Sequence, residues 1–345
     1  MPLTLKRRLL NLLPRLGVRV LDLGPGAAVL TRRSDLDIQD LGRGASLVVQ
    51  GRTHRSVRIG REGRLIGPKA MFTRDRGKRD KAVSDWLLLE HLRDILTRYR
   101  VDCVLDVGAN KGQYARMLRR AGFTGRVISF EPVPEMFAEL SAAAAQDELW
   151  DVHQVALGRE GGELEMNVVP GTLSSLLPPS EYGSTRYARL QEITTLAVPV
   201  RRLDEMWAEL GLAQPGQAGE GQAEPGQAEP GQAEAGQAEP GQAGAGRAEA
   251  AEEGDELPRV LLKLDTQGFD LEAFAGAAGV LDQIVALQSE VALLTIYEHM
   301  PRMEESMRVY EAAGFEVTGL YPVSREGRTG RVLEYDCVMV RADRL

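Results

Sequence analysis

Apolar positions along the chain alternate between two spacings, which predict alternating helices and strands. Between residues 84 and 99 they recur every three to four positions, as on one face of a helix, and Ser84 is a plausible cap. The apolar run at 101–107 indicates a buried strand. A second helix at 114–121, closed by Gly122, then leads to a second strand at 126–130.

Later segments continue this alternation. We expect strands at 152–157, 260–265 and 284–294, helices at 271–278 and 302–313, and a terminal strand pair at 315–321 and 333–340. Strands that alternate with helices form a mostly parallel sheet with helices on both faces. The predicted fold is therefore α/β and Rossmann-like, ending in an antiparallel strand pair.

A five-residue repeat interrupts this pattern at 211–254. Glycine recurs there at every fifth position, usually followed by Gln-Ala, and large apolar side chains are almost absent. Such a segment cannot offset the entropy of ordering, so we predict a disordered coil. Because strand-like runs resume on both sides, at 196–200 and 260–264, the repeat is predicted to be an insertion within one domain, residues 81–345.

The amino-terminal 80 residues form a separate basic segment of unknown role. Residues 1–100 carry a net charge of +12, whereas the remainder carries −20. A basic segment can face nucleic acid, an anionic lipid surface or an acidic body of its own chain. Phe72 is the only aromatic residue before Trp86, so no stacking platform for nucleic acid is expected. We favour docking on the chain's own body and leave peripheral membrane contact open.

Size and apolar content set the remaining limits. At 345 residues and 43% hydrophobic composition, the chain can bury a globular core. No run of about eighteen apolar residues is present, so we expect no transmembrane segment and a cytoplasmic protein. Cys103 and Cys337 lie in apolar runs without the spacing of a zinc site, so we predict buried free thiols. The oligomeric state stays open.

The first predicted strand–turn–helix carries a nucleotide-binding pattern. Asp106 ends the strand, Gly108 and Gly112 frame the turn, and Glu131 follows the next strand. Glycine lets the backbone approach a ligand closely, and a carboxylate at the next strand's tip can bind two ribose hydroxyls. The spacing Gly-x-x-x-Gly lacks the third glycine that admits a pyrophosphate. A nucleoside without a diphosphate is indicated, and S-adenosylmethionine fits best.

Polar residues of the same turn complete the predicted binding site. Asn110 and Gln113 are expected to supply polar contacts to the ligand. Asp106 is expected either to orient the loop amides or to accept a hydrogen bond from the amino group of the ligand's methionine portion.

Residues 20–27 contain a similar Asp-x-Gly-x-Gly pattern. The residues at 31–37 leave no room for a three-turn helix and a second strand. We therefore predict an ordinary strand and turn there.

Charged residues at two later strands suggest the chemistry. Lys263 and Asp265 stand at the carboxyl end of a predicted core strand, the edge where open parallel sheets hold ligands. Buried charge is costly unless it is paired or functional, so a structural pair of Lys263 with Asp265 or Glu290 stays open. Glu290 interrupts a neighbouring apolar strand and His299 follows it; a lone histidine is more often a surface or packing residue.

Eight short motifs, taken in order, resemble the FkbM family of S-adenosylmethionine-dependent methyltransferases. They lie at 106–113, 130–132, 155–158, 173–176, 201–204, 262–268, 288–290 and 297–298, within roughly residues 84–340. The resemblance implies a class I methyltransferase domain at 81–345 and O-methylation of a hydroxyl, typically on a sugar, glycan or polyketide. It also implies cofactor contacts at Asp106, Gly108, Asn110, Glu131 and Ser175.

The chain departs from the family at two motifs. Many members carry Asp-Val-Glu-Gly where this chain has Asp265-Thr266-Gln267-Gly268, a change expected to matter little. Many also carry Tyr-Glu-Gly-Gln-Pro at the position of residues 297–301. This second motif lies where the acceptor should dock, so the acceptor's identity stays open.

Methyl transfer from a sulfonium mainly requires alignment of the acceptor and exclusion of water. A neutral hydroxyl is a poor nucleophile, so we expect a general base: Asp265 first, then Glu290 or His299. A metal held by Asp265 and Glu290 could also activate the hydroxyl, but no ligand cluster demands one and no metal site is predicted. The expected partner is a small-molecule or glycan hydroxyl and not nucleic acid.

Two other functional classes stay open. A non-catalytic interaction module on a methyltransferase-like fold is compatible with the repeat and the basic amino terminus. A nicotinamide-dependent dehydrogenase is disfavoured because Gly-x-Gly-x-x-Gly is missing.

Overall fold

The computed structural model describes residues 19–24, 27–31, 36–42, 45–50, 54–59, 63–169, 171–213 and 258–344. The chain divides into two compact units, Met1–Leu87 with Pro322–Arg331 and Leu88–Tyr321 with Val332–Leu345. The disordered repeat predicted at 211–254 lies outside the described residues from position 214 onward.

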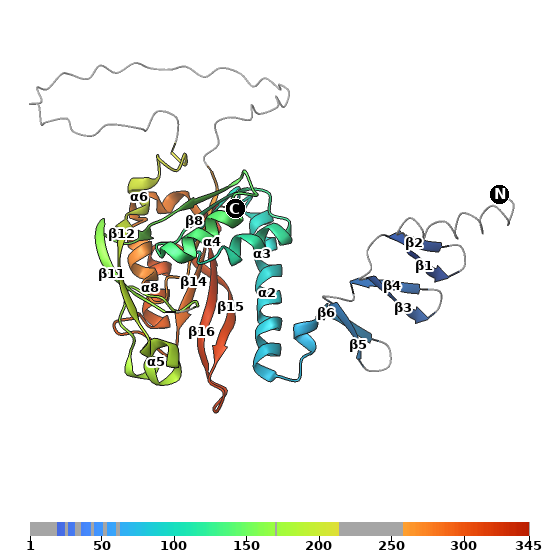
Figure 1. Ribbon diagram of the computed structural model, residues 1–345. Coiled ribbons are helices and arrows are strands. Elements are labelled where there is room, and N and C mark those ends of the chain that lie inside the picture. The colour runs from blue at the N-terminus through green and yellow to red at the C-terminus, as the bar shows by residue number, and fades with distance from the viewer. Residues whose placement is uncertain are drawn as a thin grey trace, which may run out of the picture. The chain divides into compact units, whose positions relative to one another are not determined.

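A seven-stranded sheet forms the centre of the second unit (Figure 1). Its order is β15-β16-β14-β13-β7-β8-β9. Strands β9 to β14 in this order pair in parallel, and β16 runs antiparallel to β14. The bounds are β7 Cys103–Val107, β8 Arg126–Phe130, β9 Trp150–His153, β13 Val260–Leu264, β14 Ile284–Ala292, β15 Glu316–Arg325 and β16 Val332–Val340. The predicted class I methyltransferase fold with its terminal antiparallel pair is confirmed.

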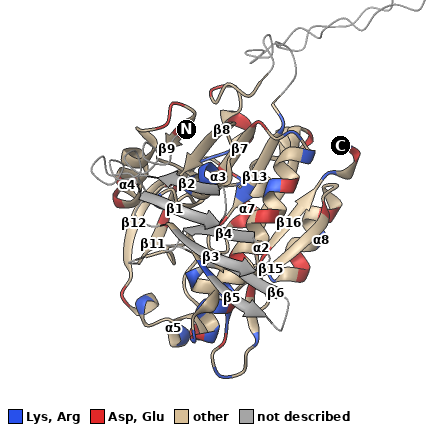
Figure 2. Ribbon diagram, turned by 90° about the vertical axis from the view of Figure 1, so that its right-hand side faces the viewer, with Lys and Arg blue, Asp and Glu red and all other residues tan. Residues whose placement is uncertain are grey.

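Helices cover both faces of this sheet (Figure 1). One face packs against α2 Arg76–Arg98, α3 Gln113–Ala121 and α4 Pro134–Ala144. The other packs against the short helices α6 Leu203–Met206 and α7 Asp270–Ala275, and against α8 Met303–Ala312. Both faces bury continuous apolar clusters, which explains why β7 and β13 are apolar on both sides. Figure 2 shows acidic residues, coloured red, along helix α8.

Helix α2 begins earlier than the sequence pattern indicates. It starts at Arg76, so Ser84 lies inside the helix and is buried, and its prediction as the cap is wrong. The carboxylate of Asp75 accepts the backbone N–H of Lys78 at 3.1 Å, which is the capping geometry. The first turns of α2 were missed because residues 76–83 are mainly polar and show no apolar period.

A second sheet lies beside the main one. The single strand expected at 152–157 divides into β9 and the short β10 Ala156–Leu157, which leaves the main sheet. There β10 pairs with β12 Thr194–Arg201, and β12 pairs with β11 Gly162–Val168. Strand β11 was not predicted, because only Met166 in it is buried. The chain between β11 and β12 forms α5 Glu181–Arg186 and η3 Ala188–Gln191.

Among the described residues of the first unit are three antiparallel strand pairs, called hairpins below. They are formed by β1 Arg19–Gly24 with β2 Ala27–Thr31, β3 Leu36–Gly42 with β4 Ala45–Gln50, and β5 His54–Ile59 with β6 Gly63–Pro68. Their registers coincide under a shift of 18 positions, since Asp22 pairs with Ala28, Asp40 with Ser46 and Arg58 with Arg64. The strand predicted within 20–27 is confirmed as β1, while residues 25–26 of the predicted turn lie outside the described residues; the three strand pairs form an internal repeat.

Three smaller predictions can also be compared with the structure. Cys103 and Cys337 are free and buried, as expected, and burial raises the pKa of each thiol to about 12. In the part of the chain that the structure describes, no helix has the length and apolar character needed to cross a bilayer. No group of potential metal ligands is found among those residues either.

Candidate functional site

The loop from Gly108 to Gly112 joins β7 to α3 through left-handed backbone. The φ angles are 77° at Gly108, 48° at Asn110 and 78° at Gly112. The amides of Gly108 and Ala109 both donate to the carbonyl of Phe130 at 3.0 Å, which fixes the loop to the end of β8. The predicted strand–turn–helix is therefore present, with its turn held against the neighbouring strand.

Both glycines of this loop are required by protein contacts. A Cβ at Gly108 would lie 2.0 Å from the carbonyl oxygen of Asp265. A Cβ at Gly112 would lie 2.6 Å from the indole ring of Trp150. Together with the positive φ angles, these contacts leave no room for a side chain at either position. The backbone of Asp265 thus packs directly on the loop, at a position where we expected a ligand to approach.

The side-chain amides expected to contact a ligand bind the loop itself. Asn110 Oδ1 accepts from the backbone N–H of Lys111 and from Gln113 Nε2, both at 3.0 Å. Asn110 Nδ2 donates to the carbonyl of Gly171 at 3.1 Å. These bonds stabilise the left-handed residue and attach the segment after β11 to the loop.

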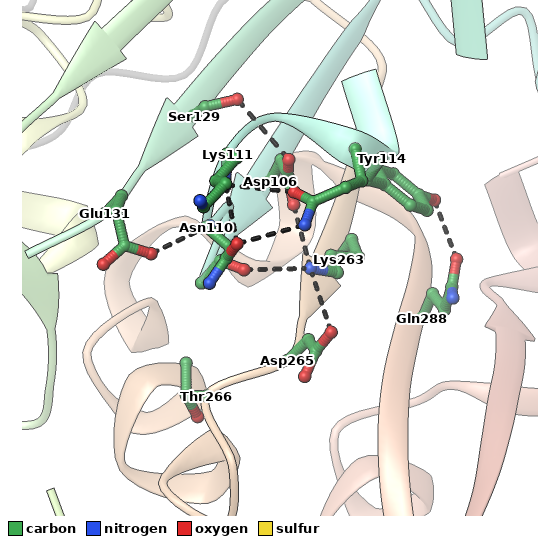
Figure 3. Close-up of polar contacts among 12 residues, drawn as sticks. Asp106, Asn110, Lys111, Tyr114, Ser129, Glu131, Lys263, Asp265, Thr266 and Gln288 are labelled. Carbon is green, nitrogen blue, oxygen red and sulfur yellow. Dashed lines mark hydrogen bonds and ion pairs between the residues drawn. The ribbon is translucent and has the colours of Figure 1, made fainter. Parts of the chain in front are cut away.

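Glu131 is buried at the carboxyl end of β8. Its Oε2 accepts the backbone N–H of Asn110 at 2.8 Å (Figure 3). Its Oε1 accepts the backbone N–H of Val133 at 2.9 Å. Burial raises the pKa of this carboxyl, and the two amide hydrogen bonds oppose the rise. Each carboxylate oxygen can still accept a further hydrogen bond, as a ribose diol requires.

A row of polar side chains crosses the sheet beneath the loop. Ser129, Asp106, Lys263 and Gln288 occupy register-matched positions on four adjacent strands. Lys263 Nζ lies 2.9 Å from Asp106 Oδ1, 3.5 Å from Asp265 Oδ2 and 3.4 Å from the carbonyl oxygen of Gly108. Figure 3 shows Lys263 between the two aspartates. Lys263 therefore joins β7, the loop and Asp265.

This lysine remains charged despite its burial. Its side chain is 6% exposed, and that of Asp106 is fully buried. Burial alone would lower the pKa of Lys263, but the carboxylates of Asp106 and Asp265 outweigh burial and raise the pKa. The structural pair of Lys263 with Asp265, which the sequence left open, is present at 3.5 Å. The closer pair, with Asp106 at 2.9 Å, was not predicted.

Asp265 lies directly after β13, beside the loop. Its backbone N–H donates to the carbonyl of Val107 at 3.1 Å, which continues the pairing of β13 with β7. Its side chain is 38% exposed, unlike that of Asp106. Gln267 Nε2 donates to Asp265 Oδ1 at 2.9 Å, whereas Lys263 lies nearest Oδ2. A solvent-accessible carboxylate thus adjoins the loop.

The other candidate residues have different surroundings. Glu290, near the end of β14, is partly exposed, and its pKa is raised by burial and by the charges of Glu334 and Asp265. Ser175 is buried; its hydroxyl donates to the carbonyl of Gln267 at 2.7 Å and accepts the N–H of Leu177 at 3.0 Å. Ser175 thus supports the turn after β13.

His299 stands apart from these groups. It is exposed and has a φ of 59°. No hydrogen bond in the described part of the chain joins it to Asp265 or Glu290.

Tyr114 was not named as a site residue, and the contacts of Gln288, which lies in the motif at 288–290, were not predicted. Tyr114 donates to Gln288 Oε1 at 2.7 Å, and Gln288 Nε2 donates to Asp336 Oδ1 at 3.0 Å. The pair of Lys263 with Asp106 could have been predicted from the sequence. Each of these residues is the only charged residue in an apolar strand, one position before the strand's end. Adjacent parallel strands of equal length place such residues side by side.

Comparison with known proteins adds the family. Residues 106–215 match the family model described as the methyltransferase FkbM domain. Over this segment the chain is similar to the methyltransferase FkbM domain. The matched part of the FkbM domain contains the glycine loop, Glu131 and Ser175, and it ends before Lys263 and Asp265. No curated protein matches the chain.

Solved methyltransferases share this arrangement only distantly. Magnesium protoporphyrin IX methyltransferase from Synechocystis PCC 6803 with bound SAM is 9% identical, covering 78% of this chain and 86% of its own, with a TM-score of 0.36. A putative S-adenosylmethionine-dependent methyltransferase from Listeria monocytogenes is 9% identical, with coverages of 75% and 99% and a TM-score of 0.36. At these scores the fold assignment of the FkbM domain rests on its strand order.

Proposed function

We propose that the FkbM domain is an S-adenosylmethionine-dependent O-methyltransferase that acts on a hydroxyl of a sugar, glycan or polyketide-type acceptor. One observation carries this proposal. The glycine loop is flanked by a buried carboxylate, Glu131, on one side and by a partly exposed carboxylate, Asp265, on the other. The first suits recognition of a ribose, and the second suits proton transfer from an acceptor.

Residues around the loop fit the cofactor. Glu131 would accept both ribose hydroxyls through its remaining lone pairs. Gly112 is the N-cap residue of α3 and provides no side-chain cap. The backbone amides of the first helical turn could therefore bind a carboxylate such as that in the methionine portion of S-adenosylmethionine. When bound, S-adenosylmethionine supplies an electrophilic methyl group.

Asp265 would act as the general base for the acceptor hydroxyl. Its carboxylate is solvent-accessible, and its backbone packs against Gly108, so a hydroxyl that faces the loop could pass its proton to this carboxylate. Glu290 suits this role less well, because burial and the carboxylates of Glu334 and Asp265 raise its pKa and so disfavour the charged form that a base requires. In its protonated form Glu290 would instead donate a hydrogen bond to a polyhydroxyl acceptor.

Cofactor binding is tested by calorimetry with S-adenosylmethionine. Glu131→Ala is expected to remove detectable binding, because the deletion also releases the amides of Asn110 and Val133. Glu139→Ala is the matched control, since that glutamate is exposed on α4 and pairs with Lys111 at the surface. Wild-type affinity in Glu131→Ala would overturn the assignment of the loop.

Turnover is tested by release of S-adenosylhomocysteine with a panel of sugar, glycan and polyketide hydroxyls. Asp265→Asn is expected to lower kcat by about 10²- to 10⁴-fold with little change in cofactor affinity. Unchanged turnover would remove Asp265 from the chemistry. Cofactor binding without turnover on any member of the panel would favour a non-catalytic binding module.

A further inference from the structure

The turn after β13 holds a glutamine in an unfavourable backbone conformation. Gln267 has a φ of 54° and is followed by Gly268 at 96°. A left-handed backbone conformation is unfavourable for a residue other than glycine and persists where the surroundings enforce it. Such residues concentrate at functional sites, so the contacts of Gln267 indicate its role.

Buried groups on both sides fix this turn. Asp270 accepts the backbone N–H of Thr266 at 2.8 Å and also its hydroxyl. Ser289 Oγ donates to the other oxygen of Asp270 at 2.9 Å. Ser175 donates to the carbonyl of Gln267 at 2.7 Å. Ser175 therefore binds the backbone of Gln267 directly, while Asp270, itself held by Ser289, fixes the preceding residue Thr266.

The side chain of Gln267 is directed at Asp265. Its Nε2 donates to Asp265 Oδ1 at 2.9 Å, and its Oε1 lies 3.5 Å from the hydroxyl of Tyr297. A carboxylate only accepts hydrogen bonds, so the amide nitrogen must be the atom facing Asp265. The proton of Tyr297 is directed to the carbonyl of Leu173 at 2.7 Å, which makes Asp265 the main partner of the amide.

Two donors therefore hold the two oxygens of Asp265. Lys263 lies nearest Oδ2 and Gln267 donates to Oδ1. Lys263 precedes Asp265 by two positions in the sequence, and Gln267 follows it by two. We propose that Gln267 is a positioning residue that orients Asp265 toward the acceptor hydroxyl, an inference that rests on the proposed function. The residue at position 267, a departure expected to matter little, then gains a role through its donor to Asp265.

The experiment compares two substitutions of the same length. Gln267→Met removes the donor, and Gln267→Glu places a second carboxylate within hydrogen-bond distance of Asp265. For Gln267→Met we expect kcat to fall by up to about a hundredfold, with wild-type affinity for S-adenosylmethionine in calorimetry. For Gln267→Glu we expect the acidic limb of the pH–rate profile to move up by at least about one pH unit, because two adjacent carboxylates share a proton.

A spectroscopic measurement makes the test independent of the acceptor. The ¹³C chemical shift of the Asp265 carboxyl is followed by NMR during a pH titration, assigned with Asp265→Asn. In Gln267→Glu this resonance should titrate at higher pH than in wild type, whereas the control Gln146→Glu, at an exposed position after α4, should leave it unchanged.

Each outcome decides a different question. An unmoved Asp265 titration together with wild-type kcat in both Gln267 variants would overturn the positioning role. A protein without turnover on any acceptor overturns the proposed function instead, while a moved titration still confirms the contact. If Gln267→Glu fails to fold, the kcat of Gln267→Met decides the question, and an unchanged kcat would overturn the role.

Discussion

Residues 20–24 and 104–108 read Val-Leu-Asp-Leu-Gly and Val-Leu-Asp-Val-Gly, and they differ at a single position. In the first, the chain turns back after Gly24 and pairs antiparallel with β2. In the second, Gly108 begins a left-handed loop that enters α3 and returns to the parallel strand β8. The strand and its glycine are alike, so the residues after the glycine decide which structure forms.

Those later residues differ in apolar spacing. Residues 27–31 are an apolar run too short for a helix, and they form a strand. Residues 113–121 bury Ala115 and Leu118, three positions apart, and form a helix that ends at Gly122. A nucleotide-binding loop therefore needs the helix and the second strand with its acid, and a glycine pattern alone is weak evidence.

The largest expected effect concerns Asp106, compared with Asp22 at the matching position of the first stretch. Asp106→Asn leaves Lys263 buried without its nearest counter-charge, so we expect the free energy of unfolding to fall by about 3–5 kcal/mol. Urea denaturation followed by circular dichroism measures this change. The same exchange at Asp22 should leave affinity for S-adenosylmethionine unchanged, and a loss of affinity there would mean that the first stretch is the ligand loop.

The two glycines give the next comparison. Gly108→Ala would bring a Cβ against the carbonyl of Asp265 at a φ of 77°. The backbone strain costs about 1–2 kcal/mol and the overpacking about 1–3 kcal/mol. We expect a lowered melting temperature and loss of cofactor binding in calorimetry. Gly24→Ala should keep wild-type cofactor affinity, and equal effects of the two substitutions would contradict the comparison.

The smallest effect concerns Glu131, the acid after the strand that follows the second stretch. Because the pKa of Glu131 is raised, its carboxylate takes up a proton at a higher pH than an ordinary glutamate does. Affinity for S-adenosylmethionine should therefore begin to weaken on acidification above the ordinary glutamate range. Calorimetry between about pH 5 and 8 measures this dependence. Glu131→Gln should bind more weakly and lose this pH dependence; a variant that keeps it would show that another group titrates.

Much of the fold was readable from periodicity, because apolar strands such as β7 and β13 are buried on both faces and stand out from their flanks. The loop and Glu131 were found for a similar reason, since they lie close together in sequence. The ion pair of Lys263 with Asp106 was not found, because it depends on which strands are neighbours across more than 150 positions. The conformation of Gln267 was not found either, because it depends on a hydrogen bond from Ser175, which is 92 positions away in sequence.

The hairpins of the first unit have a consequence for how this region can change in evolution. Each copy occupies 18 positions and reproduces the same internal pairing, so it contains all of its own strand partners. Duplication or loss of one whole copy leaves the pairing inside the others intact, whereas a deletion within a paired strand shifts the register of that pair. Relatives of this chain should therefore differ in length here by multiples of one hairpin.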